Sequence, residues 1–499
     1  MTELIHSHIL TLITFIPLLG GSIVLLIPRE QKNAIRWTSL VFTVIPLALA
    51  GMLYAGFNTA SSGFAAGTGI QFSEKYTWIR DFNINYFVGV DGLSIPMILL
   101  CGLISPLCIL ASWNIEKGVK GYHFLFLLLE TGMMGVFVAL DFFLFFIFWE
   151  LMLLPMYFLI GIWGGPRKEY AAIKFFIYTL VGSVLMLLVI IYAYLVSTPH
   201  TFDLTELAKN SSVLGYRSLL WWGLFIGFAI KIPLFPFHTW LPDAHVEAPT
   251  AISVVLAGIL LKMGTYGILR INYSLLPDVT RSMATVMATI GTINIIYGAL
   301  CAMAQKDLKK LVAYSSISHM GYVMLGMASF TDEGLNGAVL QMFNHGVVTA
   351  MLFLLVGVVY DRAHHREIDG FGGLASVAPN YAFVTFLAFF SALGLPGLNS
   401  FISEALVLLG AFKTHTALAV IAATGVIITA AYCLWTLQRV FLGSVNQKYA
   451  LLPDLTRREI VSLAPLGVLV VALGVFPHPV LNLMKSTLGS LNALVMASL

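Results

Sequence analysis

Charged residues are scarce in this sequence. Asp, Glu, Lys and Arg make up 10% of the 499 residues, against about a quarter in soluble domains. Hydrophobic residues make up 59%, so the composition excludes a soluble globular protein and indicates an integral protein of the lipid bilayer. The formal net charge of +3 is too small to indicate nucleic acid as a partner.

Motifs for redox cofactors and metals are lacking as well. The four cysteines lie singly in apolar runs, without the paired spacing of zinc or iron–sulfur ligands, so we interpret them as packing residues: Cys101, Cys108, Cys301 and Cys433. No glycine-rich phosphate-binding loop follows a strand-like run. We therefore expect no cofactor and no metal in this chain, and any redox chemistry in its partners. The N-terminal segment lacks a basic region and a cleavage site, which predicts a retained first span.

The sequence does contain a series of apolar runs of about 20 residues, the length that crosses a bilayer as a helix. An outer-membrane barrel would show short alternating segments instead. Hydropathy predicts an all-α polytopic membrane protein with about fourteen transmembrane helices, at residues 8–28, 36–56, 88–113, 122–140, 142–163, 171–196, 218–242, 249–272, 283–304, 310–330, 335–360, 380–412, 414–441 and 460–477.

The distribution of basic residues predicts the orientation of these helices. An even number of spans places both termini on one face of the membrane, and the loops predicted for the opposite face carry most of the Lys and Arg residues. Because cytoplasmic loops are enriched in basic residues, we expect both termini outside. Arg270 belongs to a predicted outer loop in this scheme.

The stretch around which the chain is organised runs from Gly223 to Pro249. A lysine in the interior of a spanning helix, here Lys231, costs roughly 2.5–3.5 kcal/mol on insertion scales. Pro233 and Pro236 follow it and remove backbone donors that a helix needs. A helix broken beside a charge is tolerated only where it faces protein or a hydrated cavity, so this stretch predicts an ion pathway.

A second broken helix is predicted between Tyr381 and Phe412, where G-L-P-G-L-N-S interrupts a run too long for one straight span. The two breaks lie five helices apart. Since five is odd, two five-helix units must have opposite orientations, which is the inverted repeat of many transporters. We predict N-terminal helices 1–3 in residues 1–121, a first repeat (helices 4–8) in 122–272, a second (helices 9–13) in 273–441, and a last helix with an amphipathic tail in 442–499.

Six ionisable residues fall within the predicted spans and form a candidate proton path: Glu150, Lys231, Lys262, His319, His345 and Glu404. Imidazole exchanges protons at ordinary pH, although a lone buried histidine is also compatible with a hydrogen-bonded core residue. Glu150 is interpreted as the charge partner of Lys231, the alternative being a protonated, hydrogen-bonded core carboxyl. We expect His238, just past the first break, to serve an inner entrance, and we interpret Asp243, His245 and Glu247 as solvated loop residues. Glu130 has no evident partner.

Three strings identify a family: FFIFWELMLLPMYFLIGIWGG, IPLFPFHTWLPDAHVEAPTAISVVLAGILLKMGTYGILRIN and KKLVAYSSISHMGYVMLG. They resemble closely the antiporter-like subunits of respiratory complex I, the proton-pumping NADH:quinone oxidoreductase, and the similarity covers essentially the whole chain. Within the family the sequence looks like chain M, the counterpart of mitochondrial chain 4. Glu404 stands where chains L and N, and the large Mrp antiporter subunits, usually carry lysine, and the tail after Pro479 is too short for the lateral helix of chain L.

The resemblance implies that Glu150 and Lys231 form an ion pair and that Glu404 is the terminal group towards the outer side. It places Lys262 at the centre of a hydrated axis that continues through His319 and His345. It also implies that NADH, FMN, iron–sulfur clusters and quinone bind to other subunits of the complex. The expected partners are other complex I membrane subunits, especially the two related antiporter-like chains on either side, in a bacterial inner membrane with both termini on the periplasmic side.

Three alternatives stay open from the sequence. The first is a subunit of a multisubunit sodium/proton antiporter, against which Glu404 argues. The second is the equivalent chain of the photosynthetic, ferredoxin-linked complex or of a membrane-bound hydrogenase. The third is a purely structural membrane scaffold, which six ionisable residues within the spans disfavour.

Overall fold

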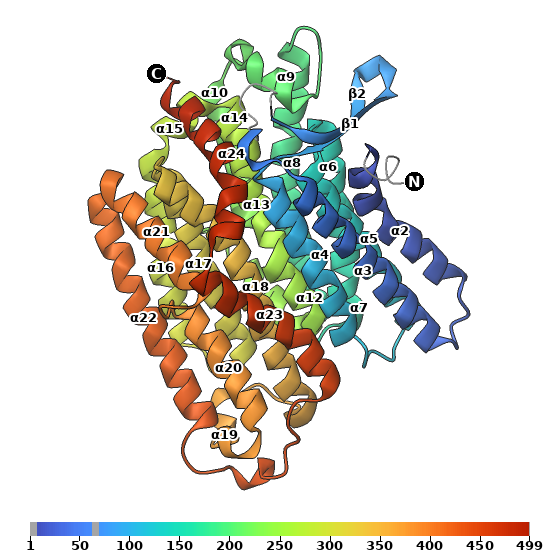
Figure 1. Ribbon diagram of the computed structural model, residues 1–499, viewed down its shortest axis with the longest axis vertical. Coiled ribbons are helices and arrows are strands. Elements are labelled where there is room, and N and C mark those ends of the chain that lie inside the picture. Colours follow the sequence, from blue (N-terminus) through green and yellow to red (C-terminus); the bar gives the residue numbers. More distant parts are fainter. Residues whose placement is uncertain (1–6, 62–68, 499) are drawn as a thin grey trace.

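The computed structural model describes residues 7–61 and 69–498. It is a bundle of long helices with the chain ends, a β hairpin and the helix α9 (Leu204–Lys209) at one end (Figure 1). Helices are the expected solution in a bilayer because they satisfy their backbone hydrogen bonds internally. The polytopic helical class predicted from the sequence is confirmed.

Eleven helices of the described chain are long and apolar enough to cross a membrane. They are α2 (Ile9–Leu26), α3 (Lys32–Gly56), α4 (Ser94–Ala111), α5 (Val119–Val138), the pair α6 and α7 (Phe142–Leu151 and Leu153–Trp163), α8 (Lys168–Val196), the α12–α14 helix (Thr250–Leu275), α16 (Ala284–Met303), α18 (Asp332–Ala363), α22 (Thr416–Phe441) and α23 (Arg457–Val475).

The other three predicted spans coincide with α17 (Leu308–Ala328) and with two interrupted helices. The first interrupted helix consists of α10 (Arg217–Lys231) and α11 (Trp240–Glu247), and the second of α20 (Pro379–Ala392) and α21 (Asn399–Thr414). Both predicted breaks are therefore present. The count of fourteen spans, the inverted relation of the two repeats and their boundaries stay predictions.

The α12–α14 helix is not uniform. It consists of α12 (Thr250–Val255), the π-helical turn η4 (Leu256–Leu260), α13 (Leu261–Gly267), a second π-helical turn η5 (Ile268–Asn272) and α14 (Tyr273–Leu275). π-helical turns occur frequently at functional sites. This helix and α18 are wholly buried in their apolar windows and form the centre of the bundle.

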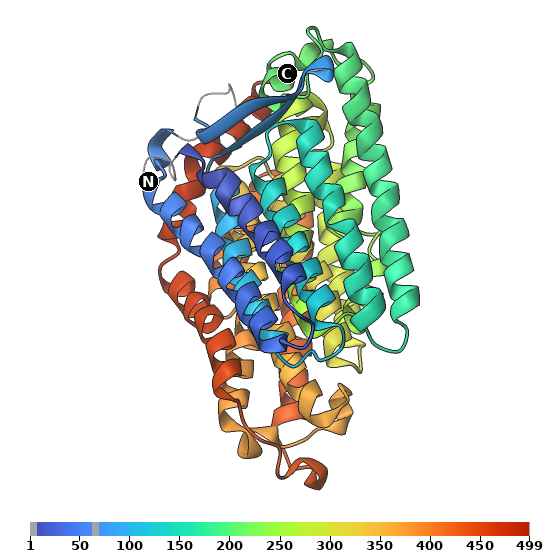
Figure 2. The same ribbon diagram turned by 90° about the vertical axis from the view of Figure 1, so that its right-hand side faces the viewer.

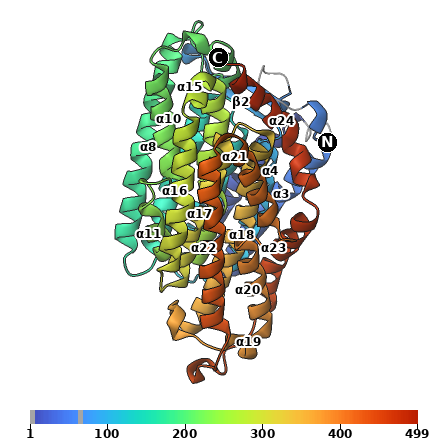
Figure 3. The same cartoon turned by 90° about the vertical axis from the view of Figure 1, so that its left-hand side faces the viewer.

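Three peripheral helices, α3, α8 and α22, are largely exposed along their apolar windows. Figure 3 shows α22 on one outer face of the bundle. Exposed side chains on these helices are themselves large and apolar, including Leu188 on α8 and Ile427 on α22. A surface of this kind is stable against lipid or against other membrane subunits.

A two-stranded antiparallel hairpin, β1 (Gln71–Ile79) and β2 (Ile84–Val90), corrects the expectation of an entirely helical chain. Figure 2 shows it at the same end of the bundle as both termini. Glu74 on β1 accepts hydrogen bonds from the backbone of Leu10 (3.0 Å) and the hydroxyl of Thr11 (2.5 Å). The carboxylate thus caps the start of α2 and fixes the hairpin there.

The remaining elements are short, except for the 19-residue helix α24. They are η1 (Thr59–Ser61), η2 (Arg80–Phe82), η3 (Ser211–Val213), α15 (Pro277–Ser282), η6 (Ile368–Gly370), α19 (Leu374–Val377), η7 (Gln447–Tyr449) and the C-terminal α24 (His478–Met496). We call the end of the bundle with β1, β2, α9 and α15 the hairpin end. The opposite end, with the connecting segments 27–31, 112–118, 164–167, 304–307, 364–373 and 442–456, is the basic end.

Contacts among the connections agree with the alternation predicted from the basic residues. At the basic end, Lys32 pairs with Glu116 at 2.5 Å, and Arg366 pairs with Asp307 at 3.1 Å. Gly165 donates its backbone N–H to the carbonyl of Glu247 at 2.8 Å. These residues come from predicted inner loops that are far apart in the sequence, and the fold brings them to one face.

Candidate functional site

The first helix break lies between Lys231, the last residue of α10, and Trp240, the first of α11. Asn294 on α16 pairs with the backbone groups that the break exposes. Its Oδ1 accepts the N–H of Phe235 at 2.8 Å, and its Nδ2 donates to the carbonyl of Pro233 at 3.3 Å. The indole of Trp240 donates to the carbonyl of Ile230 at 2.9 Å. The break is therefore a hydrogen-bonded structure held by a neighbouring helix.

Lys231 is 2% exposed, and its ammonium lies against aromatic faces. The Nζ atom is 5.2 Å from the ring centre of Trp149 and 5.8 Å from that of Phe175. Cation–π contacts of this kind stabilise a desolvated ammonium by about 2 kcal/mol. The lysine is accommodated by the rings at the end of α6 and in α8.

The expected ion pair between Glu150 and Lys231 is not formed. In the part of the chain that the structure describes, no nitrogen–oxygen contact within 4.0 Å joins them, and Oε1 of Glu150 is buried without a hydrogen-bond partner. Trp149, the preceding residue, lies against the ammonium instead. Glu150 stands in the last turn of α6, just before the interruption at Met152, where Pro155 cannot donate to the preceding turn.

Lys262 and His345 are in direct contact at the centre of the bundle. The Lys262 Nζ lies 2.6 Å from Nδ1 of His345 and donates to the carbonyl of Ala257 at 2.5 Å. Ala257 belongs to the π-helical turn η4 of the same helix. Lys262 is 0% exposed and His345 2%. The contact joins the α12–α14 helix to α18.

His319 and Glu404 form a second direct contact. Nδ1 of His319 lies 2.9 Å from Oε1 of Glu404, and Gln341 donates its amide to the same oxygen at 3.2 Å. The rings of His319 and His345 are 5.7 Å apart between centroids, and the Nε2 atoms of both are buried without a hydrogen-bond partner among residues 7–61 and 69–498. Four of the six predicted residues thus form one series from Lys262 to Glu404.

The second break separates Ala392 from Asn399. Gly394 and Gly397 have φ values of +79° and +91°, a region that side chains disfavour, and they flank Pro396. A Cβ placed on Gly394 would lie 3.2 Å from Oε2 of Glu404, so the break lies directly beside this carboxyl. Asn344 on α18 donates to the carbonyl of Asn399 at 2.8 Å.

His238 and His245 both follow the first break. His238 is 3% exposed, and its Nε2 lies 3.1 Å from the hydroxyl of Tyr297. The interpretation of residues 243, 245 and 247 as a solvated loop is wrong, because they lie in α11. His245 is 0% exposed, stacks on Phe353 at 4.6 Å between ring centres, and neither of its nitrogens has a hydrogen-bond partner in the described part of the chain. The burial of α11 could not be predicted from its sequence, because the helix is polar.

A buried ion pair lies nearer the hairpin end than Lys262, on the same helix. Arg270 donates to both carboxylate oxygens of Asp91 at 2.6 Å, and both side chains are 1% exposed. The hydroxyl of Tyr266 contacts Arg270, the hydroxyl of Ser94 and the carbonyl of Phe137, each at 3.1 Å. This corrects the assignment of Arg270 to an outer loop. The sequence signal that could have shown the position of Arg270 was its spacing, since Arg270 follows Tyr266 by four residues and Lys262 by eight.

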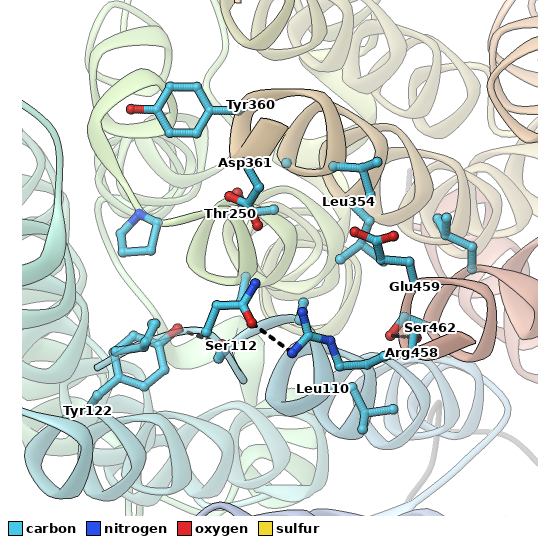
Figure 4. Close-up of a pocket in the computed structure, with 18 residues that line it drawn as sticks. Leu110, Ser112, Tyr122, Thr250, Leu354, Tyr360, Asp361, Arg458, Glu459 and Ser462 are labelled. Atoms are coloured by element: carbon cyan, nitrogen blue, oxygen red, sulfur yellow. Dashed lines mark hydrogen bonds between the residues drawn. The ribbon is translucent and has the colours of Figure 1, made fainter. Parts of the chain in front are cut away.

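A cavity of about 250 Å³ opens at the basic end between α4, α5, α18 and α23. Figure 4 shows Ser112 and Tyr122 on one side and Asp361 on another, with Arg458 hydrogen-bonded to the side chain of Asn114 at 2.9 Å. The hydroxyls of Ser112 and Tyr122 are 2.8 Å apart. This volume is enough for several water molecules, so water can approach α18 from the basic end.

Comparisons with known proteins agree with one another. The family model described as "NADH:quinone oxidoreductase/Mrp antiporter, TM" matches residues 139–429, and the model "NADH-ubiquinone oxidoreductase chain 4, amino terminus" matches residues 35–140. The NADH-quinone oxidoreductase subunit M of Rickettsia typhi is 42% identical over 489 residues, which cover 96% of this chain and 97% of the relative. That of Rhodobacter capsulatus is 42% identical over 503 residues, covering 97% and 96%.

A relative from Synechococcus elongatus, named NAD(P)H-quinone oxidoreductase chain 4 1, is 43% identical over 500 residues that cover 98% of this chain and 92% of the relative. Among solved structures, a chain of respiratory complex I from Thermus thermophilus matches with a TM-score of 0.87 and 31% identity, over 98% of this chain and 99% of the other. A chain of the Mrp complex from a Dietzia species has the same fold, with a TM-score of 0.83 at 22% identity over 98% and 97%.

Proposed function

Since this chain belongs to the subunit M family of NADH-quinone oxidoreductase, we propose that it conducts protons along its own buried side chains and carries no redox centre itself. As a multi-pass membrane subunit of this proton-translocating complex, it has other membrane subunits as partners. We place it in a bacterial inner membrane, with the basic end inside, both termini outside and a related antiporter-like chain on either side. NADH, FMN, iron–sulfur clusters and quinone are then held by other subunits.

The observation that carries the proposal is the series from Lys262 to Glu404. Two contacts of hydrogen-bond length, 2.6 Å and 2.9 Å, join an ammonium to an imidazole and an imidazole to a carboxyl. A proton leaving Lys262 passes to Nδ1 of His345 and leaves a neutral amine. Transfer on to His319 requires water between the two rings, and their unpartnered Nε2 atoms are suited to bind it. Glu404 then takes the proton from His319.

Lys231 and Glu150 form a separate group with a different role. The carboxyl of Glu150 has a buried oxygen without a hydrogen-bond partner in the described residues, and the ammonium of Lys231 lies against the rings of Trp149 and Phe175. An approach of the two opposite charges would stabilise the pair by several kcal/mol in a low-dielectric interior, and separating them would require the same energy from elsewhere in the complex. We infer that this pair opens and closes during turnover, and that the break beside Lys231 supplies the freedom to move.

The ends of the path follow from the same geometry. His238 lies beside the first break at the basic end, and the cavity at Ser112 and Asp361 offers a further place for water to enter. Towards the hairpin end, the Arg270–Asp91 pair and Tyr266 fill the space beyond Lys262 with a network in which donors and acceptors are matched. Protons on Lys262 are thereby directed sideways to His345 and leave near Glu404.

The test replaces Glu404 with glutamine, which keeps the shape and the hydrogen-bonding oxygen but cannot take up a proton. We expect Glu404→Gln to abolish most NADH-driven proton uptake into reconstituted vesicles while the complex still assembles on native gels. Glu333→Gln is the matched control, because Glu333 pairs with Lys413 at the surface and such pairs contribute about 0–1 kcal/mol. Full pumping by the Glu404 variant would exclude Glu404 as a proton site.

A further inference from the structure

An apolar groove of about 540 Å³ runs along the outside of the second half of the bundle, between α20 and α23. Figures 1 and 3 show these two helices side by side. Phe383 and Leu387 of α20 form one wall, Ile460, Ala464 and Val471 of α23 form the other, and the floor includes Met351 of α18. Each of these side chains is apolar, so the groove has no site for a polar ligand along its length.

The hollow exists because one position on α23 has no side chain. A Cβ built on Gly467 would be at ordinary van der Waals distance from Leu387 (3.5 Å) and Met351 (3.7 Å), so a side chain at this position would begin between the walls of the groove without overlapping them. Seven residues later, Gly474 is packed so tightly against the second break that a Cβ would overlap the carbonyl of Gly397. α23 therefore touches the break at Gly474 and leaves a space towards the basic end.

A positive charge stands at the basic end of the groove. Arg457 is the first residue of α23, and Ile460, Ala464, Gly467 and Val471 follow it after three, seven, ten and fourteen positions, which is one face of a helix. Arg457 is exposed, and among residues 7–61 and 69–498 it has no hydrogen bond or ion pair. The next residue, Arg458, lies on another side of the helix and donates a hydrogen bond to the side chain of Asn114 in the cavity at the basic end.

Neither neighbouring carboxylate forms an ion pair with Arg457 in the described residues, and both have other hydrogen-bond partners. Asp454 accepts the backbone N–H groups of Asn380 and Tyr381 at 3.0 Å and 2.9 Å, and so caps the start of α20. Glu459 pairs with Arg362 at 2.7 Å. Arg457 is thus the cation available to an anionic group arriving at the mouth of the groove.

The length of the groove matches one leaflet of a membrane. Fourteen residues of helix from Arg457 to Val471 span roughly 21 Å at 1.5 Å per residue. Half of a bilayer, including its headgroup region, is about 20–22 Å thick. We propose that this groove binds one phospholipid of the leaflet at the basic end, with an acyl chain along Gly467 and an anionic headgroup on Arg457. The acyl chain of this lipid would support α20, the half-helix that leads to the second break.

The test uses the whole complex, reconstituted in vesicles with a phosphatidylglycerol that carries a photoactivatable diazirine on its acyl chain. A phosphatidylcholine probe with the same chain serves for comparison, and labelled peptides are mapped by mass spectrometry. We expect the phosphatidylglycerol probe to label residues 460–472 and 383–387 more than the lipid-exposed face of α22. Against phosphatidylcholine, the preference should be about fivefold, as one surface arginine contributes near an anionic lipid.

Two variants and one control make the result specific. Gly467→Leu should remove labelling of the groove with both probes, since the leucine occupies the place of the chain. Arg457→Gln should keep the labelling but remove the preference for phosphatidylglycerol. Ala423→Leu, on the exposed face of α22, should change neither the labelling of the groove nor the preference for phosphatidylglycerol. Unchanged labelling in Gly467→Leu, or labelling no greater than on α22, would overturn the proposal. So would cross-linking of the groove to a helix of another subunit with no lipid attached.

Discussion

His345 is the residue whose replacement tests the continuity of the proton path most directly. In His345→Gln, the amide oxygen can still accept a hydrogen bond from Lys262, so the volume and the polar contact are largely kept. The relay is lost, because an amide neither takes up nor releases a proton near neutral pH. The variant removes the group that lies 2.6 Å from the Lys262 Nζ atom and whose ring centroid is 5.7 Å from that of His319.

The loss of a positioned acid–base group typically slows proton transfer by about 10²–10⁴-fold. We therefore expect proton transfer through this chain to fall by at least about 100-fold, measured as NADH-driven acidification of vesicles in which the complex is oriented. His123→Gln is the matched control, because His123 is as buried as His345 and lies on α5, away from the path, and its two nitrogens have no hydrogen-bond partner in the residues that the structure describes. Normal pumping by His345→Gln, or an equal loss in His123→Gln, would refute a relay through His345.

Three further predictions follow from other contacts. Glu150→Gln should lose most of the pumping although Glu150 makes no ion pair in the structure, because the moving charge is removed; pumping equal to that of the unmodified complex would identify Glu150 as a core residue. Asn294→Ala leaves the N–H of Phe235 and the carbonyl of Pro233 unpaired and should destabilise the chain by about 1–3 kcal/mol. Faster proteolysis would show this loss of stability. The control Asn336→Ala loses one exposed hydrogen bond to Asp332 and should leave the rate of proteolysis unchanged. Tyr266→Phe removes three 3.1 Å contacts next to the Arg270–Asp91 pair and should raise the passive proton leak of vesicles without NADH; an unchanged leak would show that Tyr266 is only a packing residue.

The two breaks could be predicted because local chemistry decides them. Pro233 and Pro236 remove backbone donors directly after Lys231, and Pro396 stands between two glycines that take positive φ. Burial of ionisable residues in long apolar runs was equally visible, since a charge in such a run requires an internal partner. Chemistry of this kind is encoded within a few residues of sequence.

The partners of these residues could not be predicted, because they come from helices far away in the chain. Asn294 supports the first break from 59 positions beyond Phe235, and Gln341 reaches Glu404 across 63 positions. The β hairpin was missed because its second strand, Ile84–Val90, reads as the start of the next apolar run. The ion pair of Glu150 with Lys231 was expected from charge alone, and in the described residues the ammonium lies against Trp149 and Phe175 instead.

The path is also interrupted at Lys231, the lysine whose expected ion pair with Glu150 is not formed. Two direct contacts and a pair of neighbouring imidazole rings connect Lys262 to Glu404, while no hydrogen bond in the described residues joins Lys231 to Lys262. A continuous path would let protons flow back with the gradient, so a pump needs one contact that forms only during turnover. The break beside Lys231 ends in a turn held by Asn294 of another helix. We infer that a small movement of that turn displaces the ammonium relative to both Glu150 and Lys262, and we propose the first break as the place where work from the rest of the complex enters this chain.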